Sequence, residues 1–132
     1  MVETAGNYRF TKAERLCSKK RIESLFHQGR SRWKGCLRIT YLISDEALEA
    51  PVQVMFAVPK KQFSRAIDRN VLKRRMREAY RLNKQDLIKQ VSSLNKYILI
   101  VFLYIGKQVE TYSLIEAELK ELLANVSKSF RR

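Results

Sequence analysis

The sequence predicts an α+β fold in which a small mixed β-sheet packs with helices, in the order α-β-β-(β)-α-β-α. Two observations predict it. Apolar residues alternate in two short segments and run continuously in a third, which is typical of strands. Around these segments, apolar residues recur at helical spacing in three others. Because a long helical pattern separates two expected strands, we expect a β-α-β crossover.

The first expected element is a helix over about residues 19–28. Ser18 is a candidate N-cap before it, and Gly29 supplies a stop after it. Three apolar residues recur at helical spacing within it: Ile22, Leu25 and Phe26. A capping-box pattern at Thr11–Glu14 precedes this helix.

Three segments read as strands. Residues 37–43 place Ile39, Tyr41 and Ile43 on one face. Residues 52–58 place Val54, Phe56 and Val58 on one face. An acidic connection over residues 44–51 joins the two. Residues 97–104 are apolar throughout, which fits a central strand that is buried on both faces and allows parallel pairing.

Two further helices are expected. The longest helical pattern runs over residues 66–84, with Asp68 or Ser64 as candidate N-caps. A capping-box pattern at Ser113–Glu116 opens the last helix. Its apolar stripe consists of Ile115, Leu119, Leu122, Leu123 and Val126.

The net charge is the most unusual bulk property. The 132 residues hold 27 Lys and Arg against 13 Asp and Glu, a net charge of +14. A compact domain with this charge attracts polyanions, which means nucleic acid or an anionic membrane surface. No apolar run approaches the roughly 20 residues that span a bilayer, so we expect no membrane partner.

The remaining composition predicts a single domain over 1–132 in a cytoplasmic protein, with flexible tails at about 1–9 and 128–132. The first residues lack the layout of a secretory signal. Cys17 and Cys36 provide neither a disulfide framework nor metal-ligand spacing. We expect Arg131 and Arg132 to form a mobile basic tail.

A single segment carries half of the net charge. From Lys60 to Arg81, nine basic residues face only Asp68 and Glu78, a net +7. At helical spacing, an arc of about 140° holds six polar residues, called the basic stripe below: Arg69, Asn70, Lys73, Arg74, Arg77 and Arg81. The adjoining arc is apolar and can face a sheet: Leu72, Met76, Ala79 and Tyr80.

The basic stripe allows three interpretations. Many charged helix faces are merely solvated, but those usually mix signs. A membrane-surface helix needs bulky apolar residues free for lipid, whereas here they are needed for the core. Like charges at i, i+4 repel by a few tenths of a kcal/mol per pair, and phosphates relieve that repulsion. The pattern therefore favours RNA or DNA, while the role of Arg75, outside the stripe, stays open.

One segment resembles a known signature. Residues 69–78 (RNVLKRRMRE) are similar to R-N-x-x-K-R-x-x-R-E of the bacterial ribonuclease P protein family. Phe10–Leu16 resembles its F-x-x-x-x-R-L. Ile22, Phe26 and Gly29 resemble its F-x-x-x-F-x-x-G, and Phe56–Lys61 resembles the strand that leads to the signature. The resemblance covers residues 10 to 104 in the family's order.

The resemblance implies an RNA-binding subunit of an endoribonuclease holoenzyme that removes the 5′ leader from precursor tRNA. It implies a left-handed crossover, against the right-handed default. The signature helix is expected to contact the catalytic RNA, and a cleft between the sheet and the first helix to hold the leader. Hydrolysis is expected from RNA-bound Mg²⁺, with no catalytic side chain, metal ligand or small-molecule substrate in the protein.

Carried over by residue, the resemblance predicts two sets of contacts. RNA-binding residues are Lys60, Lys61, Arg65, Arg69, Asn70, Lys73, Arg74, Arg77 and Arg81. Leader-cleft residues, whose rings can stack on unpaired bases, are Ile22, Phe26, Tyr41 and Phe56. The sequence departs from the family pattern at Ile22, Ser64, Val71 and Arg75.

Other residues carry less. His27 has no partner pattern and reads as a surface residue, and the acids at 45, 46 and 49 show no paired geometry. Trp33, between Arg32 and Lys34, either stacks on a base or packs against the sheet. The alternative functions are a structural, ribosomal-type RNA-binding protein and a DNA-binding regulator, although a strand precedes the basic helix where a DNA reader has a partner helix.

Overall fold

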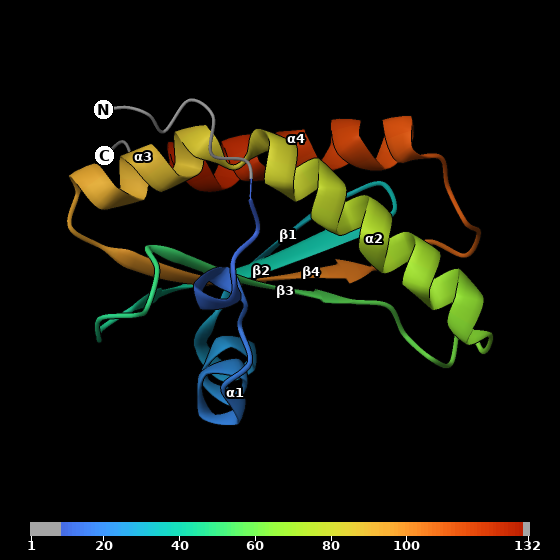
Figure 1. Ribbon diagram of the computed structural model, residues 1–132, viewed down its shortest axis with the longest axis horizontal. Helices are drawn as coiled ribbons and strands as arrows, with labels where there is room; N and C mark the ends of the chain where they lie inside the picture. Colours follow the sequence, from blue (N-terminus) through green and yellow to red (C-terminus); the bar gives the residue numbers. More distant parts are fainter. Residues whose placement is uncertain (1–8, 131–132) are drawn as a thin grey trace.

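The computed structural model describes residues 9–130 (Figure 1). Its elements follow in chain order: 3-10 helix η2 (Lys12–Glu14), α1 (Lys19–Gln28), β1 (Arg30–Lys34), β2 (Leu37–Ser44), β3 (Val52–Ala57), α2 (Ala66–Asn83), α3 (Gln85–Ser93), β4 (Tyr97–Tyr104) and α4 (Tyr112–Lys128). The predicted α+β class is confirmed.

The four strands form one mixed sheet in the order β1-β2-β4-β3. β2 pairs antiparallel with β1 and β4, and β3 pairs parallel with β4. β4 is therefore central, as its continuous apolar sequence predicts, and α2 and α3 form the crossover between the parallel strands. The left-handed sense of that crossover stays a prediction from the family resemblance.

The sheet has two differently covered faces. Figure 1 shows α2, α3 and α4 on one side, the helix-layer face, and α1 on the other, the α1 face. The larger core lies under the helix layer and includes Ile39, Ile100 and Phe102. A smaller cluster on the α1 face includes Leu25 and Leu99. Because successive strand residues alternate between faces, β2, β3 and β4 divide their side chains between these two cores.

The first helix has the predicted bounds and caps. The Ser18 hydroxyl accepts from the backbone N–H of Arg21 at 3.3 Å, and the Gly29 N–H donates to the Leu25 carbonyl at 2.8 Å. These contacts satisfy groups that a helix end leaves unpaired. α1 is thus held between its caps, with Leu25 fully buried against the sheet.

Several predicted boundaries were wrong. The sequence pattern allows one further strand without locating it, and β1 is that strand. The pattern predicts no helix after residue 84, whereas α3 begins directly after Lys84. α2 has Arg65 at its N-cap and no side-chain cap, instead of Ser64 or Asp68. α4 begins at Tyr112, and the Thr111 hydroxyl, instead of Ser113, accepts the capping N–H. The predicted apolar stripe of α4 is buried throughout.

A buried ion pair joins the N-terminal segment to the helix layer. Lys84, between α2 and α3, is 2 % exposed, and its Nζ lies 2.6 Å from Oε2 of Glu14. The Glu14 carboxylate also accepts from the Thr11 N–H at 2.8 Å, as part of the predicted capping box, which is present. The same Lys84 ammonium donates to the carbonyl of Arg9. The segment leading to α1 is therefore pinned to the helix crossover.

The last described residues belong to α4 and to the turn that follows it. α4 continues through Lys128, and Phe130 packs against the larger core. The predicted tail residues Arg131 and Arg132, and residues 1–8 of the N-terminal tail, lie outside the described residues.

Candidate nucleic-acid interface

Packing of α2 on the sheet fixes the direction of the basic stripe. Leu72, Met76, Ala79 and Tyr80 are fully buried, as the apolar arc predicts. All six stripe residues are exposed or half-buried on the other side of the helix, and so are the three basic residues ahead of them: Lys60, Lys61 and Arg65. The stripe is therefore presented to solvent by a helix that cannot rotate without emptying the core.

Most of this charge is not neutralised by the protein. Among the nine basic residues from Lys60 to Arg81, five side chains make no ion pair or hydrogen bond with any described residue, and we call them the open cations: Lys60, Lys61, Lys73, Arg74 and Arg77. Arg81 differs, because its guanidinium lies 2.6 Å from the Glu78 carboxylate. That hydrogen-bonded pairing holds the pKa of Glu78 below its usual range. Arg65 lies 4.0 Å from Asp68, at the limit of an ion pair.

Two arginines have structural contacts. Arg69 donates to the carbonyls of Phe63 at 2.7 Å and Ser64 at 2.9 Å, which ties the start of α2 to the loop before it. Arg75 donates to the carbonyl of Glu110, in the loop that leads to α4. Arg75 therefore points away from the basic stripe and holds two elements together, which answers the question that its sequence position left open.

The α1 face carries two of the four predicted cleft residues. Phe26 projects from the last turn of α1 with 54 % of its surface exposed. Ile22, one turn earlier, is half-buried against the smaller core. On the flank of α1, Arg21 pairs with Glu49 at 2.9 Å and with Glu46 at 3.4 Å, so the acidic connection is tied to this helix.

The prediction for Tyr41 and Phe56 was wrong. Both belong to the core under the helix layer, on the face opposite α1, and Tyr41 is only 5 % exposed. The Phe56 ring stacks on Phe102 at a centroid distance of 5.9 Å and meets Tyr80 edge-on at 6.0 Å. Neither ring lies between α1 and the sheet, although Phe56 also lines a cleft at the outer edge of β3. In β2 the residues on the α1 face include Leu42, which packs against the smaller cluster, and Thr40, whose hydroxyl shares a 2.9 Å hydrogen bond with Ser31.

Sequence reasoning missed one cleft that joins the two surfaces. Along the outer edge of β3, a cleft of about 390 Å³ is lined by side chains that include Arg15, Met55 and Arg77. Arg77 belongs to the basic stripe and Met55 to the α1 face. The F-x-x-x-x-R-L resemblance contained Arg15 but gave no reason to place it opposite Arg77.

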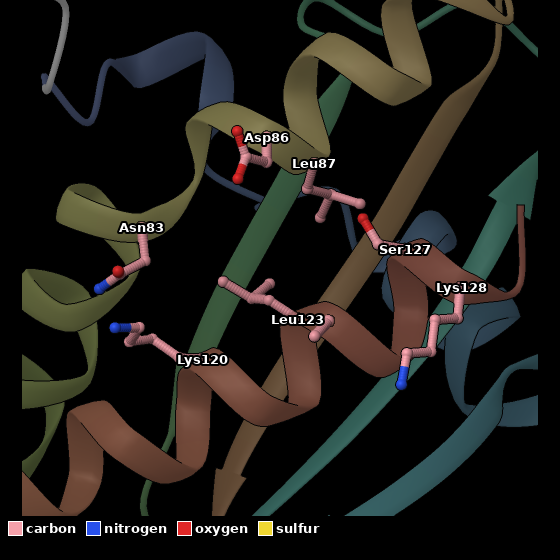
Figure 2. A pocket seen from close by; sticks show the side chains of 8 residues that line it. Asn83, Asp86, Leu87, Lys120, Leu123, Ser127 and Lys128 are labelled. Atoms are coloured by element: carbon pink, nitrogen blue, oxygen red, sulfur yellow. The ribbon is translucent and has the colours of Figure 1, made fainter. Parts of the chain in front are cut away.

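Another cleft, of about 240 Å³, lies between α3 and α4 (Figure 2). Its lining mixes signs, with Asp86 on one side and Lys120 and Lys128 on the other. No predicted RNA-binding or leader-cleft residue lines it. The predicted contacts therefore lie on α2 and on the α1 face, away from this cleft.

Two features are absent from residues 9–130. No three or more His, Cys, Asp or Glu side chains gather in a way that could hold a metal ion. None of the helices in this range combines the length and the apolar character that crossing a bilayer requires.

Comparisons with known proteins agree on one family. A family model described as Ribonuclease P matches residues 10–127. The ribonuclease P protein component of Porphyromonas gingivalis is 30% identical over 122 residues, covering 92% of this chain and 89% of that protein. The one of Chlorobaculum tepidum is 36% identical over 117 residues, covering 82% of this chain and 76% of that protein.

Solved structures show the same fold. The Staphylococcus aureus RNase P protein superposes with a TM-score of 0.69 at 20% identity, covering 91% of this chain and 100% of that one. The RNase P protein from Thermotoga maritima superposes with a TM-score of 0.65 at 22% identity, covering 85% and 96%.

Proposed function

Because the chain belongs to the ribonuclease P protein family, we propose that it binds the catalytic RNA of ribonuclease P and assists that RNA in removing the 5′ leader of precursor tRNA. Membership implies a role in the holoenzyme, an endoribonuclease that matures tRNA. In this proposal, the basic stripe of α2 contacts the catalytic RNA and the α1 face contacts the 5′ leader.

One observation carries the proposal for the catalytic RNA. The five open cations lie on α2 and just before it, and no carboxylate among the described residues neutralises them. Each Lys or Arg that neutralises a phosphate releases condensed counterions, which drives binding. Folded RNA offers closely spaced phosphates to such a helix. α2 is rigid, since its opposite side is fully buried, so it pays little ordering entropy on binding.

The leader belongs on the α1 face in this proposal. Phe26 offers an exposed ring on which an unpaired base can stack. Arg15 and Arg77 line the cleft at the edge of β3, and two guanidinium groups there suit the phosphates of a strand that passes from the α1 face to the basic stripe. Tyr41 has no part in this surface, whereas Phe56 lines the cleft at the edge of β3 together with Arg15 and Arg77.

The protein's side chains bind and orient the RNA in this proposal, and Mg²⁺ held by the RNA supplies the hydrolytic chemistry. Neutralisation by the open cations reduces repulsion between the phosphates of the two RNAs. Less Mg²⁺ is then needed to bring them together.

Reconstitution tests the function. Protein, catalytic RNA and precursor tRNA are mixed at low Mg²⁺, and we expect faster cleavage than with the RNA alone. Arg74→Ala should reduce this gain, whereas Lys120→Ala, which removes one exposed charge from α4, should not. Absence of stimulation by the wild-type protein at any Mg²⁺ concentration would contradict the proposal.

A further inference from the structure

Trp33 is an exposed ring on a part of the α1 face that no element covers. It is 62 % exposed and pairs across the sheet with Arg38. Residues that pair across the strands and point to the same face form a row of the sheet. α1 ends over the row that precedes Trp33 and Arg38, since a Cβ added to Gly29 would lie 2.8 Å from Cγ2 of Thr40. The next row, about 7 Å further along the strands, contains Trp33, Arg38, Leu103 and Ala57, all of them exposed or half-buried. The row beyond the end of α1 is thus open.

Arg38 holds the Trp33 ring and stays available to an anion. Its Cζ lies 5.7 Å from the centroid of the Trp33 ring, a cation–π contact. Its Nε is covered and has no hydrogen-bond partner, and no described carboxylate pairs with it. Arg32 and Lys34, the neighbours of Trp33 in β1, point to the other face of the sheet, where Lys34 lies 3.3 Å from Glu121 of α4. An exposed aromatic ring beside the Arg38 guanidinium suits a base with its phosphate.

The hairpin that carries this pair is held rigidly. The turn between β1 and β2 is Gly35-Cys36, and the Cys36 N–H donates to the Glu118 carboxylate of α4 at 2.9 Å. Gly35 has φ +55, and a Cβ there would lie 1.8 Å from the same carboxylate. Only glycine fits this approach. The ring is therefore preorganised, which lowers the entropy cost of stacking.

We propose that Trp33 and Arg38 form a stacking site for one unpaired base of single-stranded RNA, with the Arg38 guanidinium contacting the adjacent phosphate. The occupant is a nucleotide of the 5′ leader further from the cleavage site than the one at Phe26. This inference rests on the proposed function, because it extends the leader surface beyond α1. Charge and the open sheet row favour RNA over a protein partner.

Fluorescence gives a direct test, because Trp33 is the only tryptophan in the chain. Addition of precursor tRNA to the holoenzyme should quench or shift its emission in a leader-dependent manner. Mature tRNA should leave the emission unchanged. Emission that responds equally to both RNAs, or to neither, would overturn the assignment.

Affinity supplies the second test, with leaders lengthened one nucleotide at a time. Trp33→Ala should weaken binding of long-leader substrates about 5- to 150-fold, the equivalent of ~1–3 kcal/mol per stacked base. Leaders too short to reach β1, and mature tRNA, should bind as to wild type. Trp33→Phe should recover part of the loss. Leu94→Ala, a change at a 42 % exposed apolar residue of the helix layer, should have no effect.

The outcomes separate the two proposals. A wild-type holoenzyme that binds leader-bearing and mature tRNA equally would overturn the proposed leader surface and this inference together. A leader-dependent wild type with an unaffected Trp33→Ala would overturn this inference alone. An equal loss for every RNA would also overturn it, since Trp33 would then support the fold.

Discussion

Neighbouring arginines on α2 offer a matched test of the interface. Arg74 is exposed and has no partner, whereas Arg75 donates to the carbonyl of Glu110. Both variants, Arg74→Ala and Arg75→Ala, remove one positive charge from the same helix. Only the first should remove a phosphate contact. The salt dependence of binding to the catalytic RNA distinguishes them.

The magnitude follows from the number of open cations. Each phosphate contact contributes about 0.7–0.9 to the slope of log K against log salt. Five open cations therefore predict a slope of about −3.5 to −4.5, which means roughly 100- to 500-fold weaker binding between about 50 and 200 mM salt. Arg74→Ala should flatten the slope by about 0.7–0.9. Arg75→Ala should leave it unchanged and destabilise the fold by about 1.5–3 kcal/mol through the lost charged hydrogen bond.

The assay is equilibrium binding of each variant to the catalytic RNA across a salt series, with thermal unfolding measured beside it. An unchanged slope for Arg74→Ala would place this side chain outside the interface. Equal flattening by Arg75→Ala would show that net charge alone, and not the geometry of α2, sets the affinity. Either result would refute the reasoning from open cations.

Three other predictions concern the α1 face, the buried pair and the thiols. Phe26→Ala should weaken binding of leader-bearing substrate by about 1–3 kcal/mol and spare mature tRNA; equal losses for both would assign Phe26 to the fold. Glu14→Ala, which strands the buried Lys84 ammonium, should lower the free energy of unfolding by about 3–5 kcal/mol in denaturant titrations, and the paired change Glu14→Gln with Lys84→Met should cost less. Burial, with a carboxylate beside it, raises the pKa of Cys36 from 9.0 to about 12, so a thiol reagent at pH 8 should label the exposed Cys17 and reach Cys36 only after unfolding. The Cys36 thiol ionises at a lower pH in the unfolded chain than in the folded chain. The free energy of unfolding should therefore fall as the pH rises from 9 toward 12.

Local signals predicted the elements better than their assembly. Ser18 and Gly29 gave α1 its bounds because caps act within one turn. α3 was missed because Lys84, a buried cation with helical backbone angles, does not read as a helix boundary. The continuous apolar run of β4 indicated a central strand, but β1 shows no alternation, since four of its five residues are exposed.

Tyr41 and Phe56 show the limit of what sequence periodicity can predict. Alternation groups Ile39 with Tyr41 on one side of β2, but it does not say which helix covers that side. The resemblance placed Tyr41 and Phe56 opposite α1, whereas three helices need the larger apolar surface and take it. The sequence also does not decide between the two roles expected for Trp33, because stacking on a base and packing against the sheet require the same residue type.

The place of α2 within the chain has a consequence for how the molecule assembles. β3 and β4 pair in parallel, so their contacts are distant in sequence, and the whole basic stripe lies in the segment between them. Non-local pairing of this kind slows folding, and the like charges of the basic stripe repel one another once α2 has formed. A polyanion that binds only the finished protein stabilises it by mass action. Under the proposed function, binding of the catalytic RNA should therefore stabilise the folded chain, and purified protein without it should unfold at a lower temperature.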